Sequence, residues 1–478
     1  MLGLSVFAGG CGKSTSPQPS VVDSTLRVGV GALPQQAPQA GLRQLVSSLA
    51  LEPLASPTDD GRMRPWVLES WTTASDRLSV TLKLRPKAIF HDGSPVTAAV
   101  VVQALERSLP LSLGSIYQDV ASISEVDRLT IRIDLRKPSQ FIVEALEVTL
   151  QKPGSQTIGT GPYIMSGATT PATLTANANY YRERPTIDQL VVTSYPTVRA
   201  AWAELLRGNL DMLNEVNLDA LDSLQAATNV NVFSYVRHYQ FMIVFGPRAA
   251  ALRPPEVRRE LSAALDRDAI VREAMNGHGV VSTGPVPLQH WTMSNSATAP
   301  ARKQLAKNLA ARHLKFTCLV PPDTVYERVA LAVKRQLAAV SVEMELQEAT
   351  QQQVADAFRN GNFDALLGDI VSGPTLFRSF REWSSQGNAL TEKLSSVKID
   401  DALNRINHAI SDDEYRAGVS AYQRAITDEP PALFIAWSER ARAVSRRFFV
   451  PPPEKNGDVL NSIRLWRPVA GSPITSTN

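Results

Sequence analysis

The feature that most constrains the fold is a short pattern that occurs twice in the chain. Residues 197–206 have the apolar spacing of a helix, Gly208 follows, and a strand-like segment begins after Asp211. Residues 354–358, Gly361 and residues 365–367 repeat this order about 150 residues later. Glycine readily adopts the left-handed conformation that ends a helix. The repeat favours two lobes of related α/β construction over one large sheet, but glycine caps are common and a coincidental repeat stays open.

Alternating helical and strand-like segments extend over the rest of the chain. Thr97 is expected to cap a helix that follows it, and residues 120–135 are expected to form a hairpin. Pro255 is expected to begin a helical region. Further segments complete a mixed α/β pattern. Strands are expected at 26–30, 78–84, 172–177, 189–195 and 342–346, and helices at 41–54, 327–337, 400–410 and 414–427.

Length and charge restrict the possible functions. A chain of 478 residues can form about two to four domains. Its 49 Lys and Arg residues nearly balance 46 Asp and Glu residues, so the net charge of +3 lacks the concentrated basic field typical of nucleic-acid binding. Beyond the N-terminus, the longest strongly apolar run, about 96–105, is half as long as a membrane-spanning helix. We therefore expect no nucleic-acid partner and no later transmembrane helix.

The two cysteines have different settings. Cys318 lies in a strand-like run and is interpreted as a buried structural thiol. Cys11 ends an apolar segment of small residues and precedes a Ser, Thr and Pro-rich tail, which resembles a bacterial lipobox. The resemblance predicts a diacylglyceryl group on Cys11. A plain cleaved leader and a frayed N-terminus remain alternatives, and the cysteines are too far apart to suggest a disulfide framework.

No catalytic motif stands out. The six histidines lack metal-ligand spacing, and no nucleophile elbow is present. His278, in a Gly-His-Gly loop, is expected at the surface. Residues 9–14 resemble the end of a phosphate-binding loop, but Phe7 replaces the required first glycine. The sequence therefore predicts a protein that is not an enzyme and has no cofactor or metal.

Several segments in order resemble the extracellular solute-binding proteins of family 5, the oligopeptide, dipeptide and nickel-binding group of ABC importers. The strongest is residues 84–101, which include His91 and Asp92; we interpret these two residues as ties that hold a tight turn to the backbone. Together the matching segments cover essentially residues 26–449. They are residues 65–71, 84–101, 159–163, 177–188, 205–211 and 257–270, with 284–287 after the last.

The resemblance implies a bilobal periplasmic-binding-protein fold (type II, cluster C) with a small subdomain inserted in the first lobe. Residues 1–22 would be the lipoprotein signal and flexible tail. The first lobe would comprise residues 23–50, 158–245 and 445–478, the inserted subdomain 51–157, and the second lobe 246–444. The solute would lie between the lobes.

The resemblance also indicates a ligand-binding stretch. In peptide-binding members an acidic residue shortly before a proline pairs with the peptide's amino terminus, but here Gly373 occupies that place. We therefore expect either that Asp369 supplies the carboxylate from a shifted position, or that free amino termini are not bound in the usual way. A second group of expected ligand-binding residues follows, each of which has a purely structural role as its alternative. It comprises Phe377, Arg378, Arg381 and Trp383.

The implied function is capture of a small solute, with a short peptide as the first candidate, and its delivery to an ABC permease and its ATPase. The protein would be a monomer, lipid-anchored in the periplasm or on the outer face of the cytoplasmic membrane. Two alternatives remain. The fold could serve a sensor or chaperone lipoprotein, or the solute could be an oligosaccharide or a metal chelate.

Overall fold

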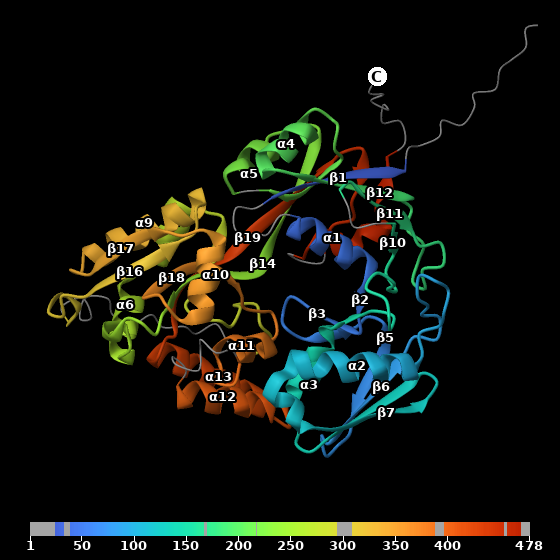
Figure 1. Cartoon of the computed structure of the whole chain (residues 1–478), viewed down its shortest axis with the longest axis horizontal. Coiled ribbons are helices and arrows are strands. Elements are labelled where there is room, and N and C mark those ends of the chain that lie inside the picture. The colour runs from blue at the N-terminus through green and yellow to red at the C-terminus, as the bar shows by residue number, and fades with distance from the viewer. Residues whose placement is uncertain are drawn as a thin grey trace, which may run out of the picture.

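The computed structural model describes residues 24–32, 39–166, 170–216, 218–293, 308–387, 396–453 and 457–469. These residues form a mixed α/β protein with two lobes and a smaller subdomain below the first lobe, as Figure 1 shows. The predicted fold class is confirmed. Cys11 lies outside the described residues.

The first lobe is built around β1. This strand pairs in parallel with β12 and β13, and β10 and β11 extend the sheet in antiparallel orientation. Leu26 and Val28, two residues apart, point to one face of β1 and pack in a core that includes Trp466 from the C-terminal segment. The elements are β1 (Thr25–Gly31), α1 (Ala40–Ala50), β10 (Tyr163–Met165), β11 (Ala172–Ala176), β12 (Gln189–Tyr195), α4 (Val198–Leu206), β13 (Met212–Val216), α5 (Leu218–Gln225), β20 (Phe448–Phe449), η5 (Val459–Leu465) and β21 (Arg467–Pro468).

The insert, defined by the elements that lie between α1 and β10, has its own antiparallel sheet in the order β5-β6-β8-β7. Helix α2 packs against it through Val101, Leu105 and Leu109, which share one helix face. The elements are β2 (Glu52–Pro53), β3 (Ala55–Pro57), β4 (Met63–Pro65), β5 (Leu68–Thr73), β6 (Ser79–Leu84), α2 (Ala98–Leu113), η1 (Gly114–Asp119), β7 (Val120–Asp127), β8 (Thr130–Leu135), α3 (Gln140–Glu144), η2 (Ala145–Glu147) and β9 (Thr149–Leu150).

Two local predictions for the insert have different outcomes. Thr97 is the N-cap residue of α2, but its side chain makes no capping hydrogen bond, so that part of the prediction is wrong. The Arg128 carbonyl instead accepts the first helical N–H, from Ala98, at 2.8 Å. The structural role of His91 is confirmed: its Nδ1 accepts the Gly159 N–H at 3.3 Å and its Nε2 lies 3.1 Å from the Gly161 carbonyl.

The second lobe contains the parallel strands β16, β17 and β18 with helices around them. Cys318 in β16 is fully buried, and this burial raises the pKa of its thiol to about 12, which confirms a structural cysteine. The elements are η3 (Ala250–Leu252), α6 (Pro255–Ala264), α7 (Arg267–Ala274), β15 (Gly279–Val281), β16 (Lys315–Val320), α9 (Thr324–Ala338), β17 (Glu343–Glu348), α10 (Gln351–Asn360), β18 (Ala365–Val371), α11 (Leu376–Trp383), α12 (Val397–Asn407) and α13 (Asp412–Asp428).

Two long strands, β14 (Val230–Phe245) and β19 (Ala432–Ser445), run from one lobe into the other. They pair with each other in antiparallel orientation and connect both sets of strands into one 11-stranded sheet. The expectation of two sheets instead of one is therefore wrong at the level of hydrogen bonding. The lobes are still distinct because their apolar residues form separate cores on either side of the crossing.

The repeated glycine pattern is confirmed. Gly208 follows α4 with a φ of 80°, and Gly361 ends α10 with a φ of 65°. Both angles lie in the left-handed region that costs glycine little. Each helix can therefore stop abruptly and return the chain to a sheet strand, β13 in the first lobe and β18 in the second.

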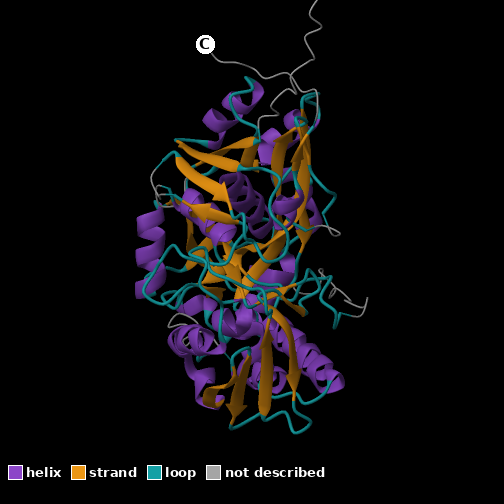
Figure 2. Cartoon of the chain, turned by 90° about the vertical axis from the view of Figure 1, so that its right-hand side faces the viewer, coloured by secondary structure: helices purple, strands orange, loops and turns teal. Residues whose placement is uncertain are grey.

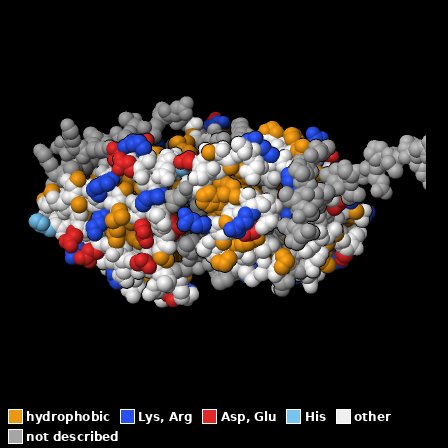
Figure 3. Space-filling model, turned by 90° about the horizontal axis from the view of Figure 1, so that it is seen from above, with side chains coloured by type: hydrophobic (Ala, Val, Ile, Leu, Met, Phe, Trp, Pro, Cys, Tyr) orange, Lys and Arg blue, Asp and Glu red, His pale blue; other side chains and the backbone are white. Residues whose placement is uncertain are grey.

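No described helix has the length and apolar character needed to span a bilayer. Figure 2, which views the molecule from the right of Figure 1, shows the first lobe above the insert, and Figure 3 shows basic and acidic side chains interspersed on one face. The described part of that face lacks a large patch of one sign.

Replacing Gly246 by alanine is expected to destabilise the second lobe. A Cβ atom at this position would lie 2.0 Å from the Phe363 carbonyl oxygen, so the backbone must shift. We expect a loss of about 1–3 kcal/mol in the free energy of unfolding, measured by urea denaturation. Gly368→Ala is the control, because its nearest new contact is an ordinary 3.5 Å. Equal stability of the two variants would contradict this packing.

Candidate functional site

The candidate site lies where β14 and β19 cross from one lobe to the other. Residues 437–440 of β19 belong to none of the apolar clusters formed by the described residues, although the strand is apolar on either side. The register between the two strands also shifts here, between Val236 and Gln240. The crossing is therefore a polar and irregular joint between two apolar cores.

Charged side chains from both lobes meet at this joint. Arg440 of β19 lies between Glu215 of β13 and Asp369 of β18. Its Nε is 3.1 Å from a carboxylate oxygen of Glu215, and its Nη2 is 3.3 Å from a carboxylate oxygen of Asp369. All three side chains are less than a fifth exposed. One guanidinium thus connects a carboxylate of the first lobe to a carboxylate of the second. We call Glu215, His278, Asp369, Glu439 and Arg440 the hinge cluster.

The ionisation of this cluster follows from its burial. Desolvation acts to lower the pKa of Arg440, but Glu215 and Asp369 outweigh it and the pKa is raised. Desolvation, followed by the nearby charge of Asp369, raises the pKa of Tyr326, so that phenol stays neutral. Two carboxylates, Glu215 and Asp369, therefore share the Arg440 guanidinium, and Glu215 also lies near the buried Arg442. Glu439 precedes Arg440 in β19, so its side chain points to the opposite face of the sheet, where it meets His278.

His278 also belongs to the cluster, so its expected surface location is wrong. Its side chain is only 14% exposed and lies between two carboxylates, 3.5 Å from Glu439 at Nδ1 and 3.5 Å from Asp222 at Nε2. The loop before β15 is held against β19, because β15 pairs with residues 436–438 of that strand. This pairing carries His278 inward.

Several buried polar atoms beside the cluster have no hydrogen-bond partner among the described residues. They include the indole nitrogen of Trp437 and the hydroxyls of Ser372 and Ser438, all on side chains at most 2% exposed. The carbonyl oxygen of the Gln240 side chain is a fourth, and Gln240 pairs with Trp437 across the two strands. Buried polar atoms are nearly always paired, so these atoms suit a bound solute or water.

Asp369 is the predicted site residue that lies in this joint. It sits near the end of β18, is 15% exposed, and is paired with Arg440. It also accepts a hydrogen bond from Tyr326. The carboxylate is therefore already partly neutralised, and an additional cation would share it with Arg440.

The other four predicted residues lie on α11, outside the cluster. Phe377 and Trp383 are 2% and 3% exposed and belong to an apolar core, where Trp383 packs edge-on against Phe434. Arg378 binds both oxygens of Glu147 in the insert, at 3.1 and 2.9 Å, and Arg381 is exposed. The structure thus places three of them in packing or ion pairing, and it does not bring them together with Asp369.

The main residues missed by sequence reasoning are Arg440, Glu439 and Glu215. A signal was present: Glu439 and Arg440 interrupt a strand that is apolar from Ala432 to Trp437. Two adjacent charges inside such a strand indicate either an exposed edge or a buried polar site. Sequence alone does not reveal that β13 supplies the partner Glu215.

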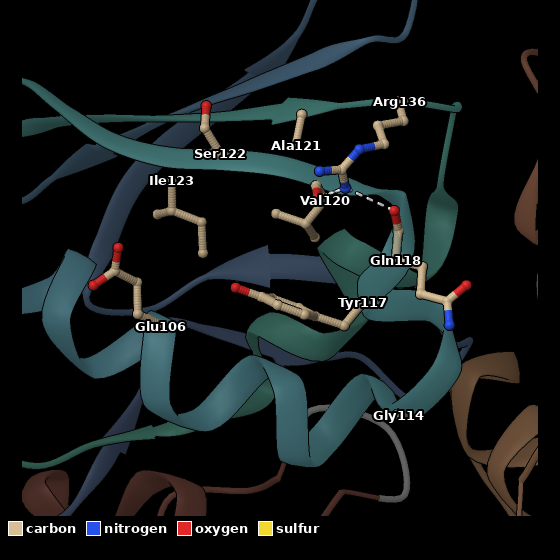
Figure 4. Close-up of a pocket in the computed structure, with 9 residues that line it drawn as sticks. All are labelled: Glu106, Gly114, Tyr117, Gln118, Val120, Ala121, Ser122, Ile123 and Arg136. Carbon is tan, nitrogen blue, oxygen red and sulfur yellow. Dashed lines mark hydrogen bonds between the residues drawn. The ribbon is translucent and has the colours of Figure 1, made fainter.

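A separate cavity of about 480 Å³ lies in the insert (Figure 4). It is formed between α2, η1 and β7, and its rim carries Glu106, Tyr117 and Arg136. The Arg136 guanidinium donates to the carbonyls of Gln118 and Val120, so it holds the η1 turn. The cavity shares no residue with the hinge cluster. No described group of His, Cys, Asp or Glu residues is arranged to hold a metal ion.

Comparison with known proteins identifies the family. The model described as "Bacterial extracellular solute-binding proteins, family 5 Middle" matches residues 62–390. The chain belongs to this family. By its description, this family consists of extracellular solute-binding proteins.

Relatives of this family 5 protein differ in what their names say they bind. The probable D,D-dipeptide-binding periplasmic protein DdpA of Escherichia coli K12 is 22% identical over 328 residues, 63% of this chain and 64% of that protein. The match thus spans less than two thirds of that relative. Two solved structures share the fold over 94% of this chain and 100% of theirs. They are NikZ of Campylobacter jejuni with Ni(L-His) (TM-score 0.79, 19% identity) and the oligopeptide-binding protein AppA of Bacillus subtilis with a nonapeptide (TM-score 0.77, 18% identity).

Replacing Arg440 by methionine is expected to destabilise this family 5 protein strongly. The change leaves Glu215 and Asp369 facing each other without their buried counter-ion, which typically costs about 3–5 kcal/mol. Thermal unfolding measures the loss, and Asp369→Asn in the same chain should restore part of it. Arg248→Met is the matched control: its ion pair with Asp364 is half exposed and should contribute about 1 kcal/mol or less. Similar losses for both variants would contradict the buried bridge.

Proposed function

We propose that this protein is the solute-binding component of an ABC importer, which captures a small solute between its lobes and delivers it to the permease. The family match and the shared fold support this proposal. The supporting observation within the molecule is the hinge cluster, where buried charges of both lobes meet at Arg440. A solute at this joint would contact both lobes at once, which is what stabilises a closed two-lobed binding protein.

We further propose that the solute carries a cationic group, with a short peptide as the leading candidate. The carboxylate of Asp369 is paired with Arg440 and is 15% exposed, and an ammonium group would be a second cationic partner for it. The orphan polar atoms of Trp437, Ser372 and Ser438 could pair with neutral amide groups of the same solute. A peptide supplies both kinds of group. A metal chelate would supply them only if it is itself cationic.

The location of the protein is part of the same proposal. Lipidation of Cys11 would anchor the mature chain, as a monomer, in the periplasm or on the outer face of the cytoplasmic membrane. We retain the division into a first lobe (23–50, 158–245 and 445–478), an insert (51–157) and a second lobe (246–444) as proposed boundaries.

Neutralising Asp369 is expected to weaken peptide binding. Native mass spectrometry of protein purified without denaturation would identify co-purified solutes, and calorimetry with tetra-alanine and N-acetyl-tetra-alanine would measure affinity. Asp369→Asn should reduce the affinity for the free peptide by about 2–5 kcal/mol, the range for truncating a buried charge partner. The acetylated peptide should lose much less.

The control for this experiment is Glu204→Gln, which neutralises a carboxylate on α4 that pairs with Arg207 at the surface. It should leave both affinities unchanged. If neither peptide binds the wild type and the co-purified solute has no cationic group, the proposed solute class is wrong.

Replacing Cys11 by serine is expected to release the protein from membranes. Serine has no thiol to accept the diacylglyceryl group, and two acyl chains on one residue are enough for stable anchoring. Fractionation of cells expressing each form, followed by immunoblotting, would measure the change. Cys318→Ser is the control because Cys318 is buried in β16. Unchanged membrane association of the Cys11 variant would refute lipidation.

A further inference from the structure

We propose that the contact between the insert and the second lobe is a releasable latch centred on Glu144, and that closing this latch takes up a proton. The latch uses none of the residues of the hinge cluster. Its action would make the closed form of the protein more favourable as the pH falls.

The chain topology allows the insert and the second lobe to separate from each other. The insert is connected to the first lobe at both ends, through α1 and β10, and the second lobe is connected to the first lobe through β14 and β19. No peptide bond joins the insert directly to the second lobe. Helix α3 of the insert nevertheless lies beside α11 and α12, as Figure 1 shows. Rotation of the lobes about the crossing strands would therefore separate these helices.

The apolar part of the latch is a set of aromatic rings. Phe141 of α3 packs against Phe377 and Phe380 of α11, with ring centroids 5.9 and 5.6 Å apart. All three side chains are buried. Burial of these rings favours the closed arrangement. Phe377 therefore contributes to the contact between the insert and the second lobe.

The polar part of the latch surrounds these rings. The side-chain oxygen of Asn407, at the end of α12, accepts hydrogen bonds from the Ser139 hydroxyl at 2.7 Å and from the Phe141 N–H at 3.3 Å. His408 Nδ1 lies 2.7 Å from the Pro138 carbonyl. Arg378 binds Glu147 through two hydrogen bonds. Each of these bonds joins the insert to the second lobe.

Glu144 is at the centre of the latch and is 7% exposed. One carboxyl oxygen accepts the Phe377 N–H at 2.7 Å, and the other lies 3.0 Å from the Tyr415 hydroxyl. Both donors are neutral, and both belong to the second lobe. Opening the latch would thus remove both hydrogen bonds and expose the carboxyl group to water.

The groups that face Glu144 do not supply a compensating cation among the described residues. Glu147 on η2 repels its negative charge, and Arg378 on α11 is already paired with Glu147. Tyr415 on α13 is neutral, because burial raises the pKa of its phenol. Asp119 lies 3.4 Å from the Asn407 amide nitrogen, His408 contacts the Pro138 carbonyl, and the His290 ring stacks on Tyr415 with the ring centroids 6.4 Å apart.

The direction of the pH effect follows from these surroundings. Burial, partly offset by the bonds from Phe377 and Tyr415, raises the pKa of Glu144 from its ordinary 4.5 to about 7 in the closed form. The protonated form is therefore favoured on closing. This contribution is complete below about pH 4.5 and is lost as the pH rises through about 7. The ratio of closed to open molecules should fall roughly tenfold from pH 6 to pH 8.

A distance measurement that needs no solute can test the latch. Spin labels would be placed at Leu111 of the insert and Val397 of the second lobe, which are 85% and 76% exposed. The labels would be attached to Leu111→Cys and Val397→Cys in the full chain. Cys11→Ser removes the other reactive thiol, and Cys318 can stay because it is buried. Pulsed electron resonance between pH 5 and pH 8 would report closed and open populations. We expect the short-distance population to increase as the pH falls.

Three variants decide the outcome. Glu144→Gln keeps an acceptor oxygen without a titratable proton and should abolish the pH dependence. Glu52→Gln is the matched control: Glu52 is also buried, but the partners of its side chain are Trp66, Thr160, Tyr180 and Tyr181, none of them in the second lobe. The doubly labelled protein with Glu52→Gln should show the same pH dependence as the doubly labelled protein with Glu52 and Glu144 intact.

If Glu144→Gln does not fold, Tyr415→Phe serves as the third variant. It removes one donor to the carboxylate and should shift the midpoint of closing to higher pH. A distance distribution that does not change with pH, or that changes identically with and without Glu144, would overturn the proposal. Either result leaves solute capture at the hinge cluster untouched, because no solute takes part.

Discussion

The ion bridge of Glu215, Arg440 and Asp369 is the interaction on which the two-lobed arrangement depends. Strand β19 must pass from one apolar core to the other, and its charged middle residues cannot be buried without partners. Glu215 arrives from the first lobe and Asp369 from the second, so the partners of one guanidinium fix both lobes relative to the crossing strand. Within the bridge two carboxylates share one guanidinium, so Asp369 can accept a further cationic partner. Structural and binding requirements therefore converge at this joint.

The sequence predicts those features of the fold that are local. Gly208 and Gly361 follow amphipathic helices, and the left-handed conformation that ends each helix needs only the glycine and its neighbours. Continuity of the sheet is different, because it depends on the pairing of β14 with β19, about 200 residues apart. No local pattern shows that these strands are long enough to serve both lobes. Hence the elements could be predicted, whereas their union in one sheet could not.

The candidate site shows the same limit at the level of side chains. Aromatic and basic residues along α11 resemble a ligand-binding segment when only the sequence is considered. In the structure, Phe377 packs against Phe141 of the insert, and Arg378 pairs with Glu147. Burying large rings is strongly favourable, so packing of α11 against the insert is more stable than leaving its rings exposed for ligand binding. Only the insert, distant in sequence, decides between these uses.

Two buried carboxyl groups illustrate how partners select a role. Asp369 has a guanidinium beside it, so its charge is balanced and remains available to attract a cation. Glu144 has only neutral donors and an acidic neighbour, so its charge is disfavoured and a proton is the simplest way to remove it. The first environment therefore suits recognition of a charged group at constant pH. The environment of Glu144 suits a contact that becomes stronger as the pH falls. Asp369 lies between the first and second lobes, whereas Glu144 lies between the insert and the second lobe.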